Sequence, residues 1–260
     1  MTSKLITEHR GPIGYLVLNT PQRRNALSLD MWQAIPGFVA QFEQNAEIRC
    51  LVITGAGTEA FAAGADISEF EANRATEEAA KIYDNATRMA VSSIIACAKP
   101  VVAAIRGICF GGGVALATAC DLRLASADAR FCIPAARLGI AYGTGGTSRL
   151  VQVLGSNVAA EMLITARVYS AHEALACGLV HQIATNTEFD GIVESYTAAI
   201  AANAPLSMTA TKRAIQAVLT RSPSAISEAE LAAGICAKSL DYEEGRAAFM
   251  QKREPRFQGH

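Results

Sequence analysis

The chain has 260 residues, of which 51% are hydrophobic and 18% charged, and its formal net charge is −1. This composition is typical of a globular protein with one large core, or with a core and a small accessory domain. A near-neutral chain lacks the basic surface that binds nucleic acid and the polybasic segment that anchors proteins to membranes. We therefore expect neither a nucleic-acid nor a membrane partner.

Two further features bear on the compartment. The first ten residues lack the apolar segment of a signal peptide, and the longest apolar run, around residues 107–120, is broken by glycines and too short to span a bilayer. The seven cysteines form no CxxC pair and several lie inside apolar runs, while the four histidines show no metal-ligand spacing. We expect buried, reduced thiols, no metal site and a cytoplasmic location.

In chain order, apolar and β-branched stretches predict strands at residues 15–19, 50–55, 101–105, 121–126 and 129–133. Helical patterns lie between them at residues 28–44, which begin with a Ser or Asp cap, and at residues 76–97.

The second half of the chain is mainly helical. Residues 170–178 carry a complete helix signal, because Ser170 and Glu173 can form a capping box and Gly178 ends the segment. From about residue 190 the pattern is helical and is interrupted at Pro205 and Pro223. We predict an α/β core over residues 1–200 and a C-terminal helical region over residues 201–260.

Two glycine-rich segments have the same local architecture. FAAGADISEF (residues 61–70) follows the strand at 50–55, and GICFGGGVAL (residues 107–116) follows the strand at 101–105. A strand that enters a helix through glycines leaves free backbone N–H groups at the helix start, where negative charge is favoured. Two such amides that converge form an oxyanion hole. Either segment alone fits a tight packing turn, but the two together favour a functional site.

These segments, with NTPQRRNALSLDMW, LGIAYGTGGTSRL and ARVYSAHEALACGLVHQI, resemble the crotonase (enoyl-CoA hydratase/isomerase) family over essentially the whole chain and in the family's order. The resemblance implies an α/β fold built as a spiral of ββα units, with a C-terminal helical region used in trimer formation. It also implies an acyl-CoA substrate, and a homotrimer or a hexamer that is a dimer of trimers. Coenzyme A is then part of the substrate, and no separate cofactor is expected.

The resemblance also assigns residues. The amides of Ala65 and Gly112 are expected to hold the thioester carbonyl. Arg23 and Arg24 could pair with the phosphates of coenzyme A or form a solvated surface pair. Asp66 could act in the mechanism or cap a helix start. The substrate-binding positions expected from the family are Arg23, Arg24, Ala26, Ala63, Asp66, Ile67, Ala115, Ala135 and Arg137.

The chain departs from the family's hydratases at two positions. Those enzymes use two glutamates to position and activate water, and the matching positions here are Ala115 and Ala135. Some isomerases of the family use an aspartate in the downstream loop, but this loop reads AYGTGGT and has no carboxylate. Alanine can act neither as an acid nor as a base, and that help is commonly worth about 10²- to 10⁴-fold in rate. Ordinary water addition is therefore not expected.

The loop LGIAY (residues 138–142) is similar to that of the family's methylmalonyl-CoA decarboxylases, which also lack both glutamates, although the decarboxylase has histidine where Ala65 stands. Decarboxylation needs no base, only a held carboxylate, a dry pocket and a hole for the enolate. Tyr142 is then either catalytic or a packing aromatic, and Arg137 either a carboxylate clamp or a surface residue.

We predict an enzyme that stabilises a thioester enolate, as a decarboxylase-type or other non-hydratase lyase or isomerase. The alternatives are a hydratase with an acid/base that the motifs do not place, and a non-catalytic acyl-CoA binding protein.

Overall fold

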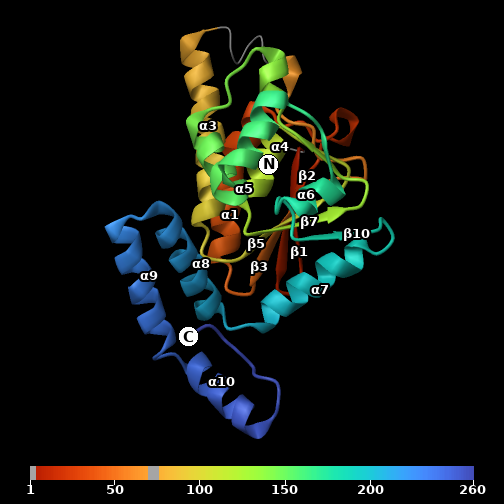
Figure 1. Ribbon diagram of the computed structural model, residues 1–260. Coiled ribbons are helices and arrows are strands. Elements are labelled where there is room, and N and C mark those ends of the chain that lie inside the picture. The colour runs from red at the N-terminus through yellow and green to blue at the C-terminus, as the bar shows by residue number, and fades with distance from the viewer. Residues whose placement is uncertain (1–3, 70–75) are drawn as a thin grey trace.

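The computed structural model describes residues 4–69 and 76–260, and its core contains two sheets (Figure 1). In spatial order the larger sheet consists of β1 (Leu5–Arg10), β2 (Ile13–Leu18), β3 (Cys50–Gly55), β5 (Val101–Ile105), β7 (Leu122–Ser126) and β10 (Gln182–Ala184). The smaller sheet consists of β4 (Ala60–Ala62), β6 (Ile108–Phe110), β8 (Arg130–Cys132) and β9 (Tyr169–Ser170). Only the pairs β1–β2 and β8–β9 are antiparallel; the other paired strands are parallel.

From β3 to β8, strands of the two sheets alternate along the chain, and helical segments follow each pair. Among the described residues, the helices before the C-terminal region are α1 (Leu29–Gln44), α3 (Glu77–Ala96), α4 (Gly112–Ala119), α5 (Thr144–Thr165), α6 (Ala171–Ala176) and α7 (Phe189–Ala202). The 3₁₀ helices are η1 (Pro21–Arg23), η2 (Ile67–Glu69) and η3 (Pro134–Leu138). The pairs β3–β4, β5–β6 and β7–β8 thus repeat one ββα unit, which confirms the expected spiral.

The central strands of the larger sheet are buried on both faces. Along β3, Leu51 and Ile53 belong to the main core with residues of α1, α3 and α4, whereas Cys50 and Val52 belong to a second cluster with residues of α7. This alternation follows from the two-residue period of a strand. Because helices cover both faces, the strand sequences read as continuous apolar runs.

The C-terminal region consists of α8 (Pro205–Thr220), α9 (Pro223–Cys236) and α10 (Leu240–Gln251), of which α9 and α10 extend away from the sheets (Figure 1). The predicted interruptions at Pro205 and Pro223 are confirmed, since each proline begins a helix. Lys212 ties α8 to the core, because its buried ammonium donates to the Asp121 carboxylate at 2.8 Å. Within the described residues, no helix is both long and apolar enough to cross a membrane.

Most predicted elements are confirmed within one or two residues. Ser170 and Glu173 form the predicted capping box of α6, and Thr76 caps α3 through the N–H of Ala79. Ser28 occupies the N-cap of α1, but its hydroxyl donates to the Asp30 carboxylate instead of capping. All seven cysteines are free thiols, five of them buried.

Other predictions are incomplete, since the short strands β9 and β10 have no counterpart among the predicted elements. Strand β1 was not anticipated, because only its first residue, Leu5, is buried and the strand carries no apolar alternation. Neither glycine-rich segment joins its predicted strand directly to a helix. The first overlaps the short strand β4 and leads into the 3₁₀ helix η2 within the described residues, and the second contains β6 before α4 begins.

Candidate active site

The three segments that the sequence assigned to the reacting centre follow three neighbouring strands. The smaller sheet orders β4, β6 and β8 side by side and parallel, so their carboxyl ends meet at one edge. Ala65 lies three residues after β4, Gly112 two after β6, and Ala135 three after β8. The Gly111 N–H donates to the Cys132 carbonyl at 2.8 Å and joins the last two segments. Ligand sites are favoured at such an edge of a parallel sheet.

A backbone bridge orients the amide of Ala65. The Leu27 N–H donates to the Gly64 carbonyl at 2.8 Å, and the Asp66 N–H donates to the Leu27 carbonyl at 2.9 Å. In a parallel bridge of this kind the groups on either side of the central residue are used, so the N–H of Ala65 faces away from Leu27. It donates no hydrogen bond within residues 4–69 and 76–260.

Gly112 begins α4, so its N–H is among the first helical N–H groups and has no acceptor in the helix. No acceptor for it lies elsewhere in the described chain either. The preceding Gly111 has φ 48°, a left-handed conformation that favours glycine. A Cβ at Gly64 would lie 3.9 Å from the Gly112 nitrogen, which places the two amide segments against each other.

One stripe of α4 is open. Gly112 and Ala115 are half-buried, whereas all other residues of this helix are buried. Positions three apart lie on the same face of a helix, so Ala115 lies beside Gly112 on that face. Ala65 and Ala135 are also half-buried and pack against the main core. The positions matching the hydratase glutamates are therefore next to open space and carry only methyl groups.

Tyr142 precedes α5 and packs against the main core. Its ring lies over Gly146, where a Cβ would be 2.7 Å from the ring carbon Cε1, so this glycine makes room for the ring. Burial raises the pKa of Tyr142 to about 12, with a smaller contribution from Cys109 of β6. The phenol is therefore neutral at pH 7, and its hydroxyl makes no hydrogen bond in the described part of the chain.

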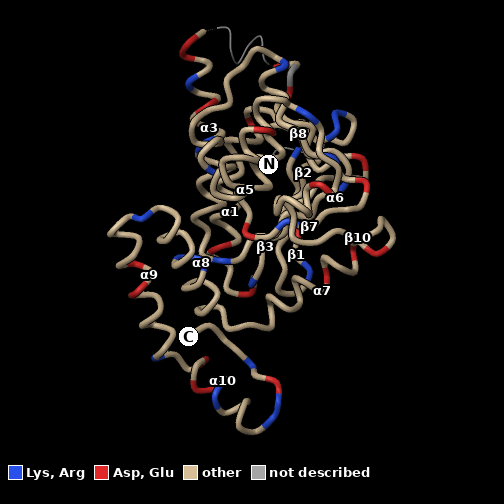
Figure 2. Tube along the Cα trace, in the orientation of Figure 1, with Lys and Arg blue, Asp and Glu red and all other residues tan. Residues whose placement is uncertain are grey.

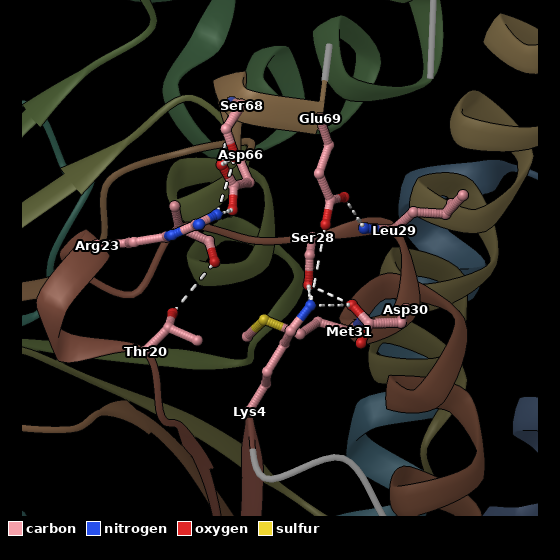
Figure 3. A network of polar contacts seen from close by, with 11 residues as sticks. Lys4, Thr20, Arg23, Ser28, Leu29, Asp30, Met31, Asp66, Ser68 and Glu69 are labelled. Atoms are coloured by element: carbon pink, nitrogen blue, oxygen red, sulfur yellow. Dashed lines mark hydrogen bonds and ion pairs between the residues drawn. The ribbon is translucent and has the colours of Figure 1, made fainter. Parts of the chain in front are cut away.

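The segment that the family resemblance places along coenzyme A lines a cavity of about 520 Å³, whose walls include Arg23, Ala26 and Asp66. Arg23 donates to the Asp66 carboxylate at 2.6 Å and to the Ser68 hydroxyl at 2.8 Å (Figure 3). Burial alone would raise the pKa of Asp66, but hydrogen bonds from Ser68 and Arg23 outweigh it and lower the pKa. Asp66 is therefore ionised at neutral pH and a poor general acid.

Arg24 differs from Arg23. Its side chain is exposed, and it forms no salt bridge in residues 4–69 and 76–260. Its backbone is left-handed, with φ 52°, and its carbonyl accepts the N–H of Ala63 at 2.9 Å. This contact places the half-buried Ala63 against the same segment.

The remaining predicted residues are peripheral or lie outside the description. Arg137 is exposed on η3, without a salt bridge in the described chain. Ile67 begins η2, and its side chain lies outside the described part of the structure.

Two residues that the sequence patterns did not single out shape the site. The buried Asn25 amide accepts the Thr20 N–H and donates to the carbonyls of Ala56 and Ala60, which fixes the loop before Leu27. Asparagine tolerates the left-handed φ of 55° found there. The chain's single tryptophan, Trp32, packs directly beneath Gly112. The only sequence signals were the asparagine in a turn and the rarity of tryptophan.

Comparisons with known proteins identify the family. The model of the enoyl-CoA hydratase/isomerase family matches residues 8–260. The short-chain-enoyl-CoA hydratase of Clostridium acetobutylicum is 33% identical over 97% of this chain and 96% of its own length. The crotonyl-CoA hydratase of Syntrophomonas wolfei is 35% identical, with 97% of each chain covered.

The fold agrees as well. A crystal structure of an enoyl-CoA hydratase/carnithine racemase from Magnetospirillum magneticum superposes with a TM-score of 0.94 at 36% identity, covering 100% of this chain and 97% of that one. The chain belongs to the enoyl-CoA hydratase/isomerase (crotonase) family.

Proposed function

We propose that the protein stabilises the enolate of an acyl-CoA thioester and acts as a decarboxylase-type or other non-hydratase lyase or isomerase. The proposal rests on two backbone amides, Ala65 and Gly112, that donate to no acceptor among the described residues, together with alanine at positions 115 and 135. Such amides stabilise charge on a carbonyl oxygen, and each is worth about 3 kcal/mol of barrier in comparable sites. No side chain at the two alanine positions can move a proton.

Decarboxylation fits these groups. The bond between the α-carbon and the substrate carboxylate breaks, carbon dioxide leaves, and the electron pair passes to the thioester carbonyl as an enolate. The amides of Ala65 and Gly112 would hold the enolate oxygen. Two alanines also avoid negative charges that would repel a carboxylated substrate.

Tyr142 is the proposed proton donor. Its phenol is neutral at pH 7, its hydroxyl is unpaired in the described chain, and it lies near β6, which leads into the Gly112 turn. After carbon dioxide leaves, the hydroxyl would protonate the α-carbon and recover its proton from water. Tyr142→Phe should then lower turnover by about 10²-fold or more while acyl-CoA affinity is kept.

The deciding experiment offers the protein malonyl-CoA, methylmalonyl-CoA and ethylmalonyl-CoA and measures carbon dioxide release. Release above the uncatalysed rate from at least one of them is expected. No release from any of the three would refute the decarboxylase form of the proposal.

Hydration is the second candidate, because the relatives compared above carry hydratase names. Near the site, Asp66 is the carboxylate adjacent to Ala65, and it is held by Arg23 and Ser68. Robust hydration of crotonyl-CoA by the wild-type protein would establish this candidate and overturn our interpretation of Ala115 and Ala135.

We further propose that the protein assembles as a homotrimer or as a dimer of trimers. Support comes from large apolar side chains that are exposed on the C-terminal helices, among them Val218, Leu231, Phe249 and Met250. Exposed apolar area of this kind is characteristic of protein–protein contacts.

A further inference from the structure

The end of α4 opposite the candidate oxyanion hole is occupied by arginine. Arg123 is buried, with 5% of its surface exposed, and follows α4 on β7. Its guanidinium donates to the Cys120 carbonyl at 2.8 Å, the Leu179 carbonyl at 2.6 Å and, more weakly, the Ala117 carbonyl at 3.4 Å. Two of these three acceptors lie in the last turn of α4 or directly after it.

A second arginine reaches the same end from α5. The Nε of the half-buried Arg149 donates to the Thr118 carbonyl at 2.6 Å. The two guanidiniums thus supply donors to carbonyls at the end of the helix, of which that of Ala117 also accepts the Cys120 N–H at 3.2 Å. Burial lowers the pKa of Arg123 to about 10, and both side chains stay protonated at neutral pH.

Neither arginine has a carboxylate in direct contact in the described part of the chain, and Asp121 attracts both of them only from a distance. Within the described residues no salt bridge includes Arg123 or Arg149, and the Asp121 carboxylate is taken by the Lys212 ammonium and the Val101 N–H. The cluster of Arg123, Arg149, Lys212 and Asp121 therefore holds three cations and one anion. Burying like charges together costs free energy, so an acceptor of negative character is needed. The C-terminal end of α4 supplies it.

Helix α4 is short enough for the charge at its C-terminal end to affect the electrostatic potential at its N-terminal end. Eight residues span about 12 Å, so the negative C-terminal end lies close enough to offset part of the positive potential at the N-terminal end. The helix is otherwise apolar, and its single polar side chain, Thr118, donates to carbonyls of its own helix. Two cations at the C-terminal end cancel the negative pole and leave the Gly112 end positive.

We propose that Arg123 and Arg149 are positioning residues for the thioester carbonyl: they hold α4 in place and offset its negative pole, which strengthens the pull of the Gly112 amide on the carbonyl oxygen. This inference rests on the proposed oxyanion hole. It does not depend on which reaction follows, because a bound thioester is polarised before any bond breaks.

The experiment measures carbonyl polarisation directly. Butyryl-CoA labelled with ¹³C at the carbonyl carries neither a carboxylate to lose nor a double bond to hydrate, so it stays intact. Isotope-edited infrared spectra compare its carbonyl band free in solution and bound to the protein. In the wild-type protein the band should move to lower frequency, because hydrogen bonds to the oxygen weaken the double bond.

Two substitutions of Arg149 separate charge from anchoring. Arg149→Gln keeps a donor and removes the charge, and it should retain less than about half of the wild-type shift. Arg149→Lys keeps the charge and should retain most of the shift. With the substrate that is turned over, Arg149→Gln should lower kcat by about tenfold and change KM less than about twofold. Arg88→Gln is the matched control, since Arg88 is exposed on α3 and donates to Asn85.

The outcomes distinguish the two proposals. A wild-type band at the solution frequency would refute the oxyanion hole and this inference with it. A wild-type shift that Arg149→Gln retains in full would refute this inference alone. Trp32 fluorescence during urea unfolding checks that each variant folds. If Arg149→Gln does not fold, Arg123→Lys carries the test: it keeps the charge but cannot reach three carbonyls at once, and an undiminished shift there refutes the anchoring role.

Discussion

The residue at position 112 must be glycine because of what lies beneath it. A Cβ there would be 2.9 Å from Trp32 Cζ2 and 3.3 Å from Leu27 Cδ1, and both side chains are buried. Neither can withdraw without disturbing the packing of α1 against the main core. The glycine that frees an amide for the ligand is thus also the residue that lets α4 approach α1.

We predict that Gly112→Ala destabilises the protein by about 1–3 kcal/mol through overpacking and lowers turnover by about 10²-fold or more, because the amide donor is displaced. Urea unfolding followed by Trp32 fluorescence measures the first effect, and the carbon dioxide assay the second. Gly145→Ala is the matched control: a Cβ there meets nothing within 4 Å. Equal behaviour of the two variants would contradict the close packing at Gly112.

A second prediction at this scale concerns the alanines. Because Ala115 and Ala135 border open space, glutamates can be placed there without being buried. The double variant Ala115→Glu/Ala135→Glu should hydrate crotonyl-CoA measurably faster than the wild-type protein, since general acid–base groups add about 10²- to 10⁴-fold. The double glutamine variant supplies matched bulk without acid–base chemistry and should show no gain. If the glutamates bring no hydration, these positions do not face the acyl chain as proposed.

At the scale of elements, the site depends on two loops that pair with each other. Residues 24–27 and 63–66 exchange three backbone hydrogen bonds, and the Arg23–Asp66 pair closes them at one side. The loop that would carry coenzyme A therefore also orients the Ala65 amide. Binding of coenzyme A and polarisation of the thioester carbonyl therefore depend on the same pair of loops.

This arrangement predicts unequal roles for the two arginines. Arg24 is exposed and unpaired in the described chain, whereas Arg23 is already engaged by Asp66. Arg24→Gln should raise the KM for acyl-CoA by about tenfold at unchanged kcat, as expected for loss of a charge-assisted phosphate contact. Arg23→Gln should lower kcat as well, because it loosens the loop behind Ala65. Steady-state kinetics of both variants measure these effects. If Arg23→Gln changes KM but not kcat, the loop that binds coenzyme A does not orient the Ala65 amide.

Several of these elements could be predicted from the sequence, and the reasons for the others are physical. The capping box at Ser170 and the helix starts at Pro205 and Pro223 are local signals, so they were recovered. The strands β4 and β6 have three residues each, too few for a periodic pattern. The pairing of Leu27 with Ala65 and the packing of Trp32 under Gly112 are contacts between distant segments, which no local pattern contains.

At the scale of the whole molecule, charges of both signs are interspersed along the chain (Figure 2). The core holds buried thiols. Burial raises the pKa of Cys50 and of Cys120 to about 12 and that of Cys109 well above its ordinary value of 9.0. The pH-dependent stabilisation from these neutral, buried thiols is fully present in the free energy of unfolding below pH 9, the ordinary thiol pKa. It is lost as the pH rises from 9 toward 12, because the unfolded chain can then ionise and the folded chain cannot.

We therefore predict that the urea midpoint is flat between pH 7 and 8.5 and falls above pH 9. The free energy of unfolding should fall there by up to about 1.4 kcal/mol per pH unit for each buried thiol. Cys120→Ala should reduce the slope. A midpoint that stays constant to pH 10.5 would contradict the burial of these groups. Reductant is kept in all samples so that thiol oxidation does not contribute.

The exposed apolar side chains belong to the same scale. Phe249 and Met250, at the end of α10, are 83% and 80% exposed, and Val218 on α8 is 74% exposed. A lone chain would leave this area in water, at a cost of about 25 cal/mol for each Å² that an interface would cover. Assembly through the C-terminal helices removes that cost and fits the proposed trimer.

Light scattering after size-exclusion chromatography should give three or six times the 27.4 kDa chain mass. The double variant Phe249→Glu/Met250→Glu should dissociate to single chains, because each charge would have to be buried in the interface without a partner. Gln251→Glu is the matched control, since it adds a charge at the neighbouring exposed position. A wild-type mass of one chain, or a double variant that keeps the wild-type mass, would place the subunit contacts elsewhere or rule them out.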